Sequence, residues 1–209
     1  MAFPSNNSRR LTTLLLAAGA SSRMRGQDKL LQPIDGIPLL RVLVERVSDI
    51  SDQVLVALPQ DRPARAAALK GTSAQSIVVP EASEGMAHSL KGALSFVRPD
   101  ASAVMIVPAD MPELTSADFA TLSEMHQAHP DLIIRGAAED GRPGHPVIFP
   151  QPYFPVLSKL SGDLGARSIL QDNKSQIHLC PLPEEHALTD LDTPEEWATW
   201  YAAQFDRGL

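Results

Sequence analysis

Short apolar runs that alternate with helix-patterned segments constrain the fold of this chain more than any other feature of its sequence. Each run is three to seven residues long, as buried strands are. These runs lie at 11–17, 53–58, 77–79, 103–107, 132–134, 147–149 and 176–180. Segments with apolar residues at helical spacing lie at 39–47, 62–70, 86–97, 116–129, 164–171 and 194–204. This alternation predicts a doubly wound, Rossmann-like α/β fold, with a mostly parallel sheet and helices on both faces.

The length and composition of the chain fit a single folded domain. The chain has 209 residues, of which 44% are hydrophobic and 21% charged, so a globular protein is expected rather than a disordered one. Its single cysteine, Cys180, excludes an intrachain disulfide framework. Neither an internal repeat nor a linker divides the sequence. We predict one domain at 11–205, preceded by a disordered tip at 1–10.

The net charge limits the partners of the protein. A formal charge of −7 counts against a protein that coats nucleic acid or anionic lipid. No apolar run reaches the ~18 residues of a membrane span. We therefore expect neither a nucleic-acid nor a membrane partner. The charge is uneven, because residues 1–50 hold seven Lys or Arg against four Asp or Glu, whereas residues 180–209 hold one against seven. This asymmetry indicates a local anion site, with a metal ion nearby.

The N-terminal sequence has two interpretations. The twin arginine Arg9-Arg10 and the apolar run behind it imitate a secretion signal. The competing interpretation is a buried first strand that enters a tight turn. The apolar run is short for a signal, and Thr12 and Thr13 interrupt it. The basic residues that follow make chemical sense only if the segment is retained. We therefore favour the strand and expect a cytoplasmic protein.

The loop after the first strand has the composition of a phosphate site. Small residues at 17–20 allow backbone N–H groups to approach a ligand closely, and such groups form an anion nest. Arg23, Arg25 and Lys29 add positive charge to the same loop. A flexible basic surface loop is the alternative. Neither the dinucleotide fingerprint nor the P-loop pattern is present, which disfavours a dinucleotide oxidoreductase and a P-loop kinase.

Two acidic motifs complete the set of charged candidates. Asp110 directly follows a buried strand, where a carboxylate can hold Mg²⁺ against phosphate oxygens; the alternative is that it caps a turn. Asp190 and Asp192 precede the last predicted helix, whose Thr193-Pro194-Glu195-Glu196 start has the pattern of a capping box. One of the two acids completes a metal site with Asp110, or both complement the helix dipole.

These motifs together resemble the MobA-like nucleotidyltransferases of molybdenum-cofactor maturation, and most of all their molybdopterin cytidylyltransferase branch. The resemblance begins with Leu16-Ala17-Ala18-Gly19, Ser21, Arg23-Met24 and Lys29. It continues through Glu84-Gly85-Met86, Ser89, Pro108-Ala109-Asp110-Met111-Pro112, Gly144-His145-Pro146-Val147, Gly162-Asp163-Leu164-Gly165-Ala166-Arg167 and Asp190-Leu191-Asp192-Thr193. One position departs from the family pattern, because Arg25 stands where these proteins usually have glycine.

The resemblance implies a role for each matching residue. The nucleotide would contact Ala17, Ala18, Gly19, Ser21, Pro80, Gly85 and Ser89. Arg23 and Lys29 would grip the triphosphate and, with Asp110, act in catalysis. Mg²⁺ would bind Asp110 and Asp192. A molybdopterin-type substrate would contact Gly144, His145, Asp163 and Arg167; for His145, placed in a loop, the alternative is that it caps loop carbonyls.

The function implied is the transfer of CMP from CTP to the terminal phosphate of molybdopterin, with Mg²⁺ and release of pyrophosphate. Three alternatives stay open. One is a guanylyl or sugar-phosphate nucleotidyltransferase. Another is a non-catalytic nucleotide-binding accessory protein. The third is a nicotinamide-linked oxidoreductase. A molybdenum hydroxylase or its chaperone is the further partner that the resemblance suggests.

Overall fold

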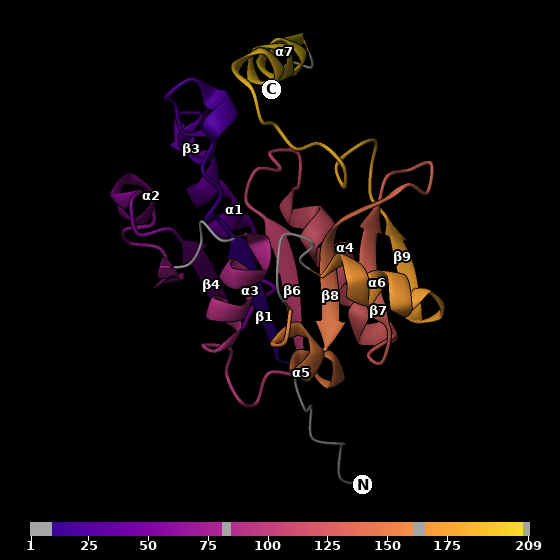
Figure 1. Cartoon of the computed structure of the whole chain (residues 1–209). Coiled ribbons are helices and arrows are strands. Elements are labelled where there is room, and N and C mark those ends of the chain that lie inside the picture. The colour runs from indigo at the N-terminus through magenta and orange to yellow at the C-terminus, as the bar shows by residue number, and fades with distance from the viewer. Residues whose placement is uncertain (1–9, 81–84, 161–165, 207–209) are drawn as a thin grey trace, which may run out of the picture.

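A seven-stranded sheet organises the molecule (Figure 1). The computed structural model describes residues 10–80, 85–160 and 166–206. The strand order is β5-β4-β1-β6-β8-β7-β9. The strands are β1 (Leu11–Leu16), β4 (Gln53–Leu58), β5 (Gln75–Val78), β6 (Ala103–Pro108), β7 (Ile133–Ala137), β8 (Pro143–Pro150) and β9 (Ile177–Pro181). Only β8 pairs antiparallel with its neighbours, so the predicted mostly parallel sheet is confirmed.

Helices cover both faces of the sheet, as predicted. They are α1 (Leu39–Ser48), α2 (Pro63–Ala68), α3 (Met86–Leu94), α4 (Ser116–Ala128), α5 (Phe154–Leu157), α6 (Arg167–Asp172) and α7 (Pro194–Asp206). Successive side chains of β1 pack on opposite faces of the sheet, because side chains alternate across a strand. Leu15 packs with residues of α1, α4 and α7, whereas Leu14 packs with residues of α3, α5 and α6. The segment that imitates a secretion signal is thus an interior strand of the sheet, buried on both faces.

Two local sequence signals give the predicted structures. The short strands β2 (Pro33–Ile34) and β3 (Ile37–Pro38) form a hairpin, whose turn residues Asp35 and Gly36 have φ of 51° and 80°. Such a turn requires positive φ at both central positions, and glycine adopts positive φ without strain. At the start of α7, the Glu196 N–H donates to Thr193 Oγ1 over 3.2 Å, and the Thr193 N–H donates to Glu196 Oε2 over 2.9 Å. This is the predicted capping box.

The strand that contains His145 corrects the sequence analysis. The prediction placed residues 144–146 in a loop, because glycine and proline are turn signals. They instead lie in β8, which pairs with both β6 and β7. Pairing with β7 at Pro143 and Val147, together with the bond from the His145 N–H to the Ala187 carbonyl, outweighs the local signals. Because β8 is antiparallel, its first residues lie at the sheet edge where β1 and β6 end.

The order of the strands creates a crevice at that edge. From β1 the chain crosses to β4 on one side, and β6 later adds on the other side of β1. Ligands of open α/β sheets bind at such a reversal, outside the carboxyl ends of the strands. The predicted tip at 1–10 falls largely on residues 1–9, outside the described residues, and the bounds 11–205 stay a prediction. No helix in the described ranges is long and apolar enough to cross a membrane.

Candidate functional site

A cavity of about 760 Å³ opens at the carboxyl ends of β1 and β6. Nine of the residues predicted to bind nucleotide or metal line it: Ala18, Gly19, Arg23, Lys29, Pro80, Gly85, Ser89, Asp110 and Asp192. They come from segments that are far apart in the sequence, and the sheet edge brings them together. Two predicted residues, Ala17 and Ser21, lie outside the lining. Ala17 is buried, with only 1% of its surface exposed.

Lys29 lies between two carboxylates of this cavity. Its Nζ donates to Asp110 Oδ2 over 2.5 Å and to Asp192 Oδ1 over 2.7 Å. The three side chains are only 12%, 19% and 15% exposed, so solvent screens these ion pairs less than surface pairs. Burial by itself lowers the pKa of Lys29, but the charges and hydrogen bonds of Asp110 and Asp192 outweigh it and raise the pKa. Lys29 is therefore a permanent cation at neutral pH.

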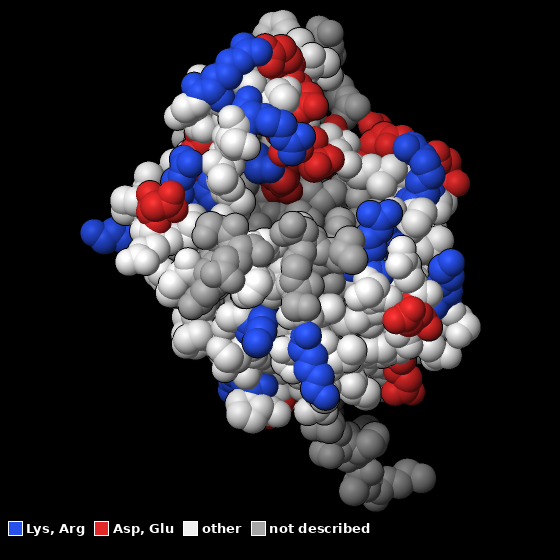
Figure 2. Space-filling model, viewed as in Figure 1, with Lys and Arg blue, Asp and Glu red and all other residues white. Residues whose placement is uncertain are grey.

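Two arginines connect the first loop to the start of α7. Arg23 Nη2 lies 2.5 Å from Asp192 Oδ2, and Arg25 Nη2 lies 2.6 Å from Glu195 Oε1. Basic and acidic side chains accordingly gather side by side toward the end of the molecule that carries α7 (Figure 2). Arg25 has φ of 51°, a left-handed conformation. Glycine adopts it without strain, whereas another residue loses about 1–2 kcal/mol. Arg25 adopts this conformation while it forms the ion pair with Glu195.

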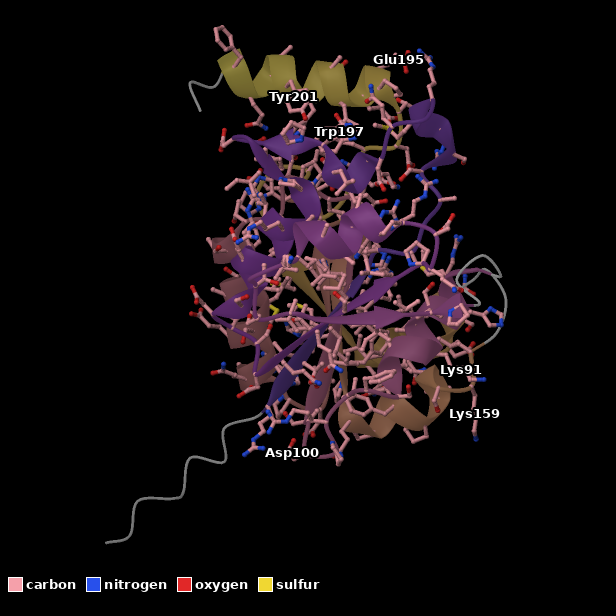
Figure 3. The ribbon with its side chains drawn as sticks, turned by 90° about the vertical axis from the view of Figure 1, so that its left-hand side faces the viewer. Lys91, Asp100, Lys159, Glu195, Trp197 and Tyr201 are labelled. Atoms are coloured by element: carbon pink, nitrogen blue, oxygen red, sulfur yellow. The ribbon has the colours of Figure 1, made fainter. Side chains whose placement is uncertain are left out.

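Helix α7 holds these acids in place. Figure 3 shows it across one end of the domain, with Trp197 and Tyr201 directed toward the core. Trp197 is 2% exposed, and the Tyr201 hydroxyl donates to the Pro33 carbonyl over 2.9 Å. The Asp192 N–H donates to Glu196 Oε2 over 2.7 Å, which fixes the backbone at the acid itself. The position of Asp192 thus depends on the docking of a C-terminal helix against a hairpin near the N-terminus.

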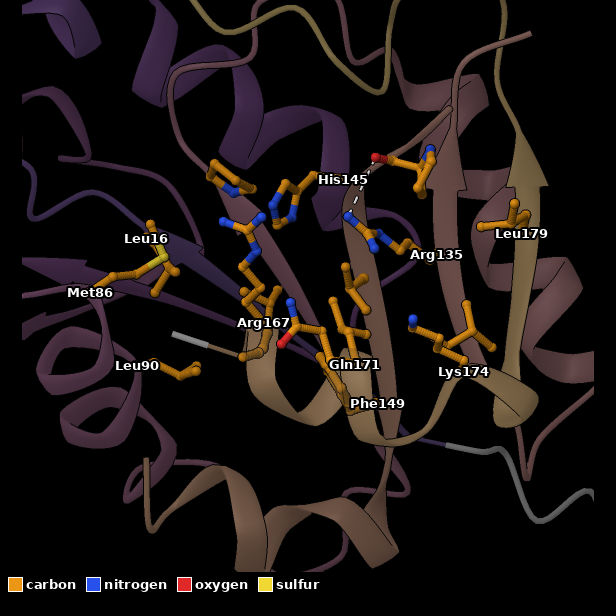
Figure 4. A pocket seen from close by; sticks show the side chains of 17 residues that line it. Leu16, Met86, Leu90, Arg135, His145, Phe149, Arg167, Gln171, Lys174 and Leu179 are labelled. Carbon is orange, nitrogen blue, oxygen red and sulfur yellow. Dashed lines mark hydrogen bonds between the residues drawn. The ribbon is translucent and has the colours of Figure 1, made fainter. Parts of the chain in front are cut away.

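A second cavity, of about 790 Å³, adjoins the first and shares Leu16, Met86 and Pro108 with it (Figure 4). His145 and Arg167, two of the residues predicted to bind the second substrate, line it. Gly144 does not line it; a Cβ there would lie 1.9 Å from the Ala187 carbonyl oxygen, so the position requires glycine for close packing. The fourth predicted residue, Asp163, lies outside the described residues.

His145 is a neutral side chain in the wall of the second cavity. Burial and, next, the positive charge of Arg135 lower its pKa to about 4, although Asp110 acts in the opposite direction. Its backbone N–H donates to the Ala187 carbonyl over 2.8 Å. Among the described residues, its buried Nδ1 has no hydrogen-bond partner. The imidazole is therefore available to a ligand as a neutral hydrogen-bonding group.

Comparison with known families assigns the domain. A model of the MobA-like NTP transferase domain matches residues 13–178, most of the chain. This chain belongs to the MobA-like NTP transferase family. The protein is therefore a nucleotidyltransferase, an enzyme that joins a nucleotide to a second substrate.

Relatives of this MobA-like protein agree with the assignment. The molybdenum cofactor guanylyltransferase of Burkholderia vietnamiensis is 32% identical over 166 residues, which are 78% of each chain. The probable molybdenum cofactor guanylyltransferase of Natronomonas pharaonis is 32% identical over 195 residues, covering 88% of this chain and 94% of that protein.

Solved structures have the same fold. Rv0371c from Mycobacterium tuberculosis H37Rv superposes with a TM-score of 0.80 at 25% identity, over 92% of this chain and 98% of that one. A manganese complex of Rv0371C gives a TM-score of 0.74 at 23% identity, over 91% and 97%.

The acids of this MobA-like domain have the donor atoms that a hard divalent cation prefers. Asp110 Oδ1 is buried and has no hydrogen-bond partner among the described residues. In contrast, both oxygens of Asp192 are engaged, one by Lys29 and one by Arg23. No group of three or more His, Cys, Asp or Glu side chains in the described ranges is arranged to hold a metal. The unengaged Oδ1 of Asp110 fits a cation such as Mg²⁺, which binds through one or two carboxylates plus substrate phosphates and water.

Asp190 and Asp192, which the sequence did not separate, differ in the structure. Both line the first cavity, but only Asp192 contacts Lys29 and Arg23. Partial burial, followed by repulsion from Asp110 and Asp192, raises the pKa of Asp190. Asp190 therefore adds negative charge to the cavity without an ion pair of its own in the described residues.

Sequence reasoning missed the residue that supports the nucleotide loop. Arg65 of α2 is fully buried, and its guanidinium donates to Asp28 Oδ2 over 2.8 Å and to Asp28 Oδ1 over 2.9 Å. It also donates to the Ala17 carbonyl over 2.5 Å and to Ser21 Oγ over 3.0 Å. Ala17 and Ser21 thus face their support rather than the cavity. An arginine in an alanine-rich helix is expected to be exposed to solvent, so no local signal identified Arg65 as a buried residue.

Proposed function

We propose that this protein transfers GMP from GTP to the phosphate of a molybdopterin-type acceptor and releases pyrophosphate. The names of the relatives at 32% identity support GTP, whereas the sequence analysis predicted CTP. The Ala17-Ala18-Gly19 sequence, which resembles the cytidylyl branch, is the observation that favours CTP. CTP is accordingly the second candidate donor.

The observation that carries the proposal is the Lys29–Asp110–Asp192 cluster in the first cavity, which the second cavity adjoins. A triphosphate in the first cavity would place its phosphates near Arg23 and Lys29. An acceptor in the second cavity would reach the nucleotide past the shared residues Leu16 and Pro108. Two reactants held in adjoining cavities react as if within one molecule, which supplies much of the rate enhancement.

The proposed reaction is an in-line displacement at phosphorus. An oxygen of the acceptor phosphate attacks the α-phosphorus of the nucleotide and forms a new P–O bond. The bond from the α-phosphorus to the bridging oxygen breaks, and that oxygen leaves with pyrophosphate. A phosphate monoester has a second pKa near ~6, so it is already a nucleophilic anion at neutral pH and needs no general base. His145, which is neutral, would orient the acceptor by hydrogen bonding.

The side chains of the chain would stabilise the negative charge of this reaction. Lys29 and Arg23 would neutralise the departing pyrophosphate. Asp110 would hold Mg²⁺ through its free Oδ1, with Asp192 as a second ligand once Arg23 turns to the triphosphate. The cation, when bound, polarises phosphate oxygens and offsets their charge. Triphosphate binding thus exchanges ion pairs inside the protein for ion pairs with the ligand.

The test is pyrophosphate release with Mg²⁺, molybdopterin and each NTP in turn. GTP is expected to give the highest rate; a higher rate with CTP would make the second candidate correct. Nucleotide binding without pyrophosphate release under any condition would contradict the proposal and favour an accessory protein. Release with a sugar phosphate in place of molybdopterin would keep the reaction and change the acceptor. The cytoplasmic location and a molybdenum hydroxylase or its chaperone as partner stay predictions.

A further inference from the structure

We propose that Arg135 and Arg167 together bind the phosphate of the acceptor, which makes Arg135 a further substrate-binding residue of this transferase. The inference rests on the proposed function, since it takes the second cavity as the acceptor site. It also defines the acceptor by chemical class: a phosphate monoester attached to an apolar or aromatic body.

Both arginines enter the second cavity beside His145. Arg135 comes from β7 and Arg167 is the first residue of α6, and both line the cavity. Figure 4 shows their guanidinium groups on either side of His145 in this view, whereas Lys174 lies farther away. Two planar guanidinium groups that face one space match the oxygens of a phosphate group.

The described lining of this cavity contains no acidic side chain. Neither arginine forms an ion pair within the described part of the chain. The two cations affect each other, since burial and then the charge of Arg167 lower the pKa of Arg135. An anion between the two arginines would offset both the cost of burying the charge of Arg135 and the repulsion between the two cations.

The guanidinium of Arg135 is held in place before any ligand arrives. Its Nε donates to the Gly144 carbonyl over 2.9 Å, and its Nη2 approaches the Pro143 carbonyl at 3.4 Å. The Gly144 carbonyl itself is fixed by the tight packing of that residue against Ala187. The Nη1 group makes no such bond in the described residues and is free to donate to a ligand. A preorganised donor of this kind loses little freedom on binding.

The rest of the cavity sets the kind of molecule that carries the phosphate. Its wall is largely apolar, with contributions from Leu90, Val147, Phe149 and Leu170. Such a wall fits a ring system, and apart from His145 and the two arginines its described polar side chains are Gln171 and Lys174. The phosphate end lies beside His145, and the negative charge of Asp110 in the first cavity acts on the pKa of that histidine. The reacting group therefore lies toward the Lys29 cluster, and the apolar body lies away from it.

Direct binding tests the inference without turnover. The full-length protein is titrated by calorimetry with 1-naphthyl phosphate, 1-naphthol and inorganic phosphate, in the absence of nucleotide. We expect 1-naphthyl phosphate to bind more tightly than either fragment. Arg135→Gln and Arg167→Gln are each expected to weaken its binding about tenfold, the usual scale of a charge-assisted hydrogen bond. Arg135→Lys, which keeps the charge, is expected to recover part of the affinity.

The control is Lys159→Gln, which removes one exposed positive charge outside the cavity lining (Figure 3). It is expected to leave 1-naphthyl phosphate binding unchanged. Circular dichroism checks that each variant is folded. If 1-naphthyl phosphate does not bind, or binds equally to Arg135→Gln and the wild type, the inference is wrong.

Steady-state kinetics separates this inference from the proposed function. Arg135→Gln is expected to raise the KM for the acceptor about tenfold and to leave the KM for the nucleotide unchanged. Normal turnover with an unchanged acceptor KM in Arg135→Gln would overturn the phosphate site and leave the transferase function intact. No turnover by the wild type, combined with phosphate binding that depends on Arg135, would overturn the function and leave the site intact.

Discussion

Both cavities contain basic side chains, but among the described residues only those of the first cavity contact carboxylates. In the first, Lys29 and Arg23 contact the carboxylates of Asp110 and Asp192 at 2.5–2.7 Å. In the second, Arg135 and Arg167 line a wall that has no acidic residue among its described members. The described lining of the first cavity is therefore close to neutral, whereas the described lining of the second is positively charged.

This difference matches the two ligands that we propose. A nucleotide binds together with a divalent cation, so its site needs carboxylates as well as basic side chains. The cluster of Lys29, Asp110 and Asp192 contains both. An acceptor phosphate brings no cation, and a site with unpaired arginines neutralises it directly. The overall charge of −7 thus coexists with one positive cavity at the sheet edge.

The largest expected effect comes from removing the Asp110 carboxylate of the first cavity, whose Oδ1 has no partner among the described residues. Asp110→Asn keeps the shape of the side chain but removes the charge that would hold Mg²⁺ at Oδ1. Pyrophosphate release is expected to fall to background at every Mg²⁺ concentration, with an unchanged circular dichroism spectrum. Asp100→Asn, at an exposed acid remote from both cavities, is the matched control. Retained Mg²⁺-dependent turnover in Asp110→Asn would remove this residue from the metal site.

Removing the cation of the same cluster is expected to have the next largest effect. Lys29→Ala takes away the ammonium that would neutralise departing pyrophosphate, and kcat is expected to fall by about 10²–10³, the usual scale for one electrostatic donor. Measurement of kcat at saturating nucleotide and acceptor checks this. A near-normal kcat would mean that the ion pairs of Lys29 have only a structural role.

The support of the nucleotide loop predicts a loss of stability. Arg65→Met leaves the Asp28 carboxylate and the Ala17 carbonyl without their partner. The free energy of unfolding is expected to fall by about 3–5 kcal/mol, as when one member of a buried ion pair is removed. Urea denaturation measures it. Arg62→Met, which removes one hydrogen bond to the Ala20 carbonyl, is the matched control and is expected to cost far less. Equal losses in both variants would contradict the supporting role of Arg65.

The second cavity predicts a smaller, pH-dependent effect. The pKa of His145 is about 4 when folded, against 6.5 for the free side chain, so the unfolded chain binds the proton first. Stability is therefore lost as the pH falls from 6.5 toward 4. Between pH 7 and pH 5 this residue is expected to cost about 2 kcal/mol. His145→Gln should reduce the pH dependence of urea denaturation by that amount, and an identical pH dependence in both proteins would show that His145 is not held neutral.

The parts of the fold that were predictable are those with local causes. The apolar run at 11–17 contains β1 because a run of apolar side chains suits a parallel strand that is buried on both faces. The turn at Asp35-Gly36 and the capping box at Thr193 also depend only on residues a few positions apart. The cluster around Lys29 was predictable for a related reason, since residues that follow parallel strands meet at one edge of the sheet.

The parts that were missed depend on distant partners. Arg65 is buried because Asp28, 37 residues earlier, accepts its hydrogen bonds. His145 lies in a strand because β7 pairs with Pro143 and Val147 on either side of it and its own N–H donates to the distant Ala187 carbonyl. Arg135 sits in a strand of apolar neighbours, and only the packing of α6 over the sheet turns it into a cavity residue. No local pattern contains such information.

The contrast between the two cavities is tested most directly by measuring both KM values in two matched variants. Arg23→Gln and Arg135→Gln each remove one arginine, from the first and the second cavity respectively. The account predicts a crossed result: Arg23→Gln raises the KM for the nucleotide and leaves that for the acceptor, and Arg135→Gln does the reverse. If both variants raise the same KM, the two cavities do not bind separate substrates, and the account is wrong.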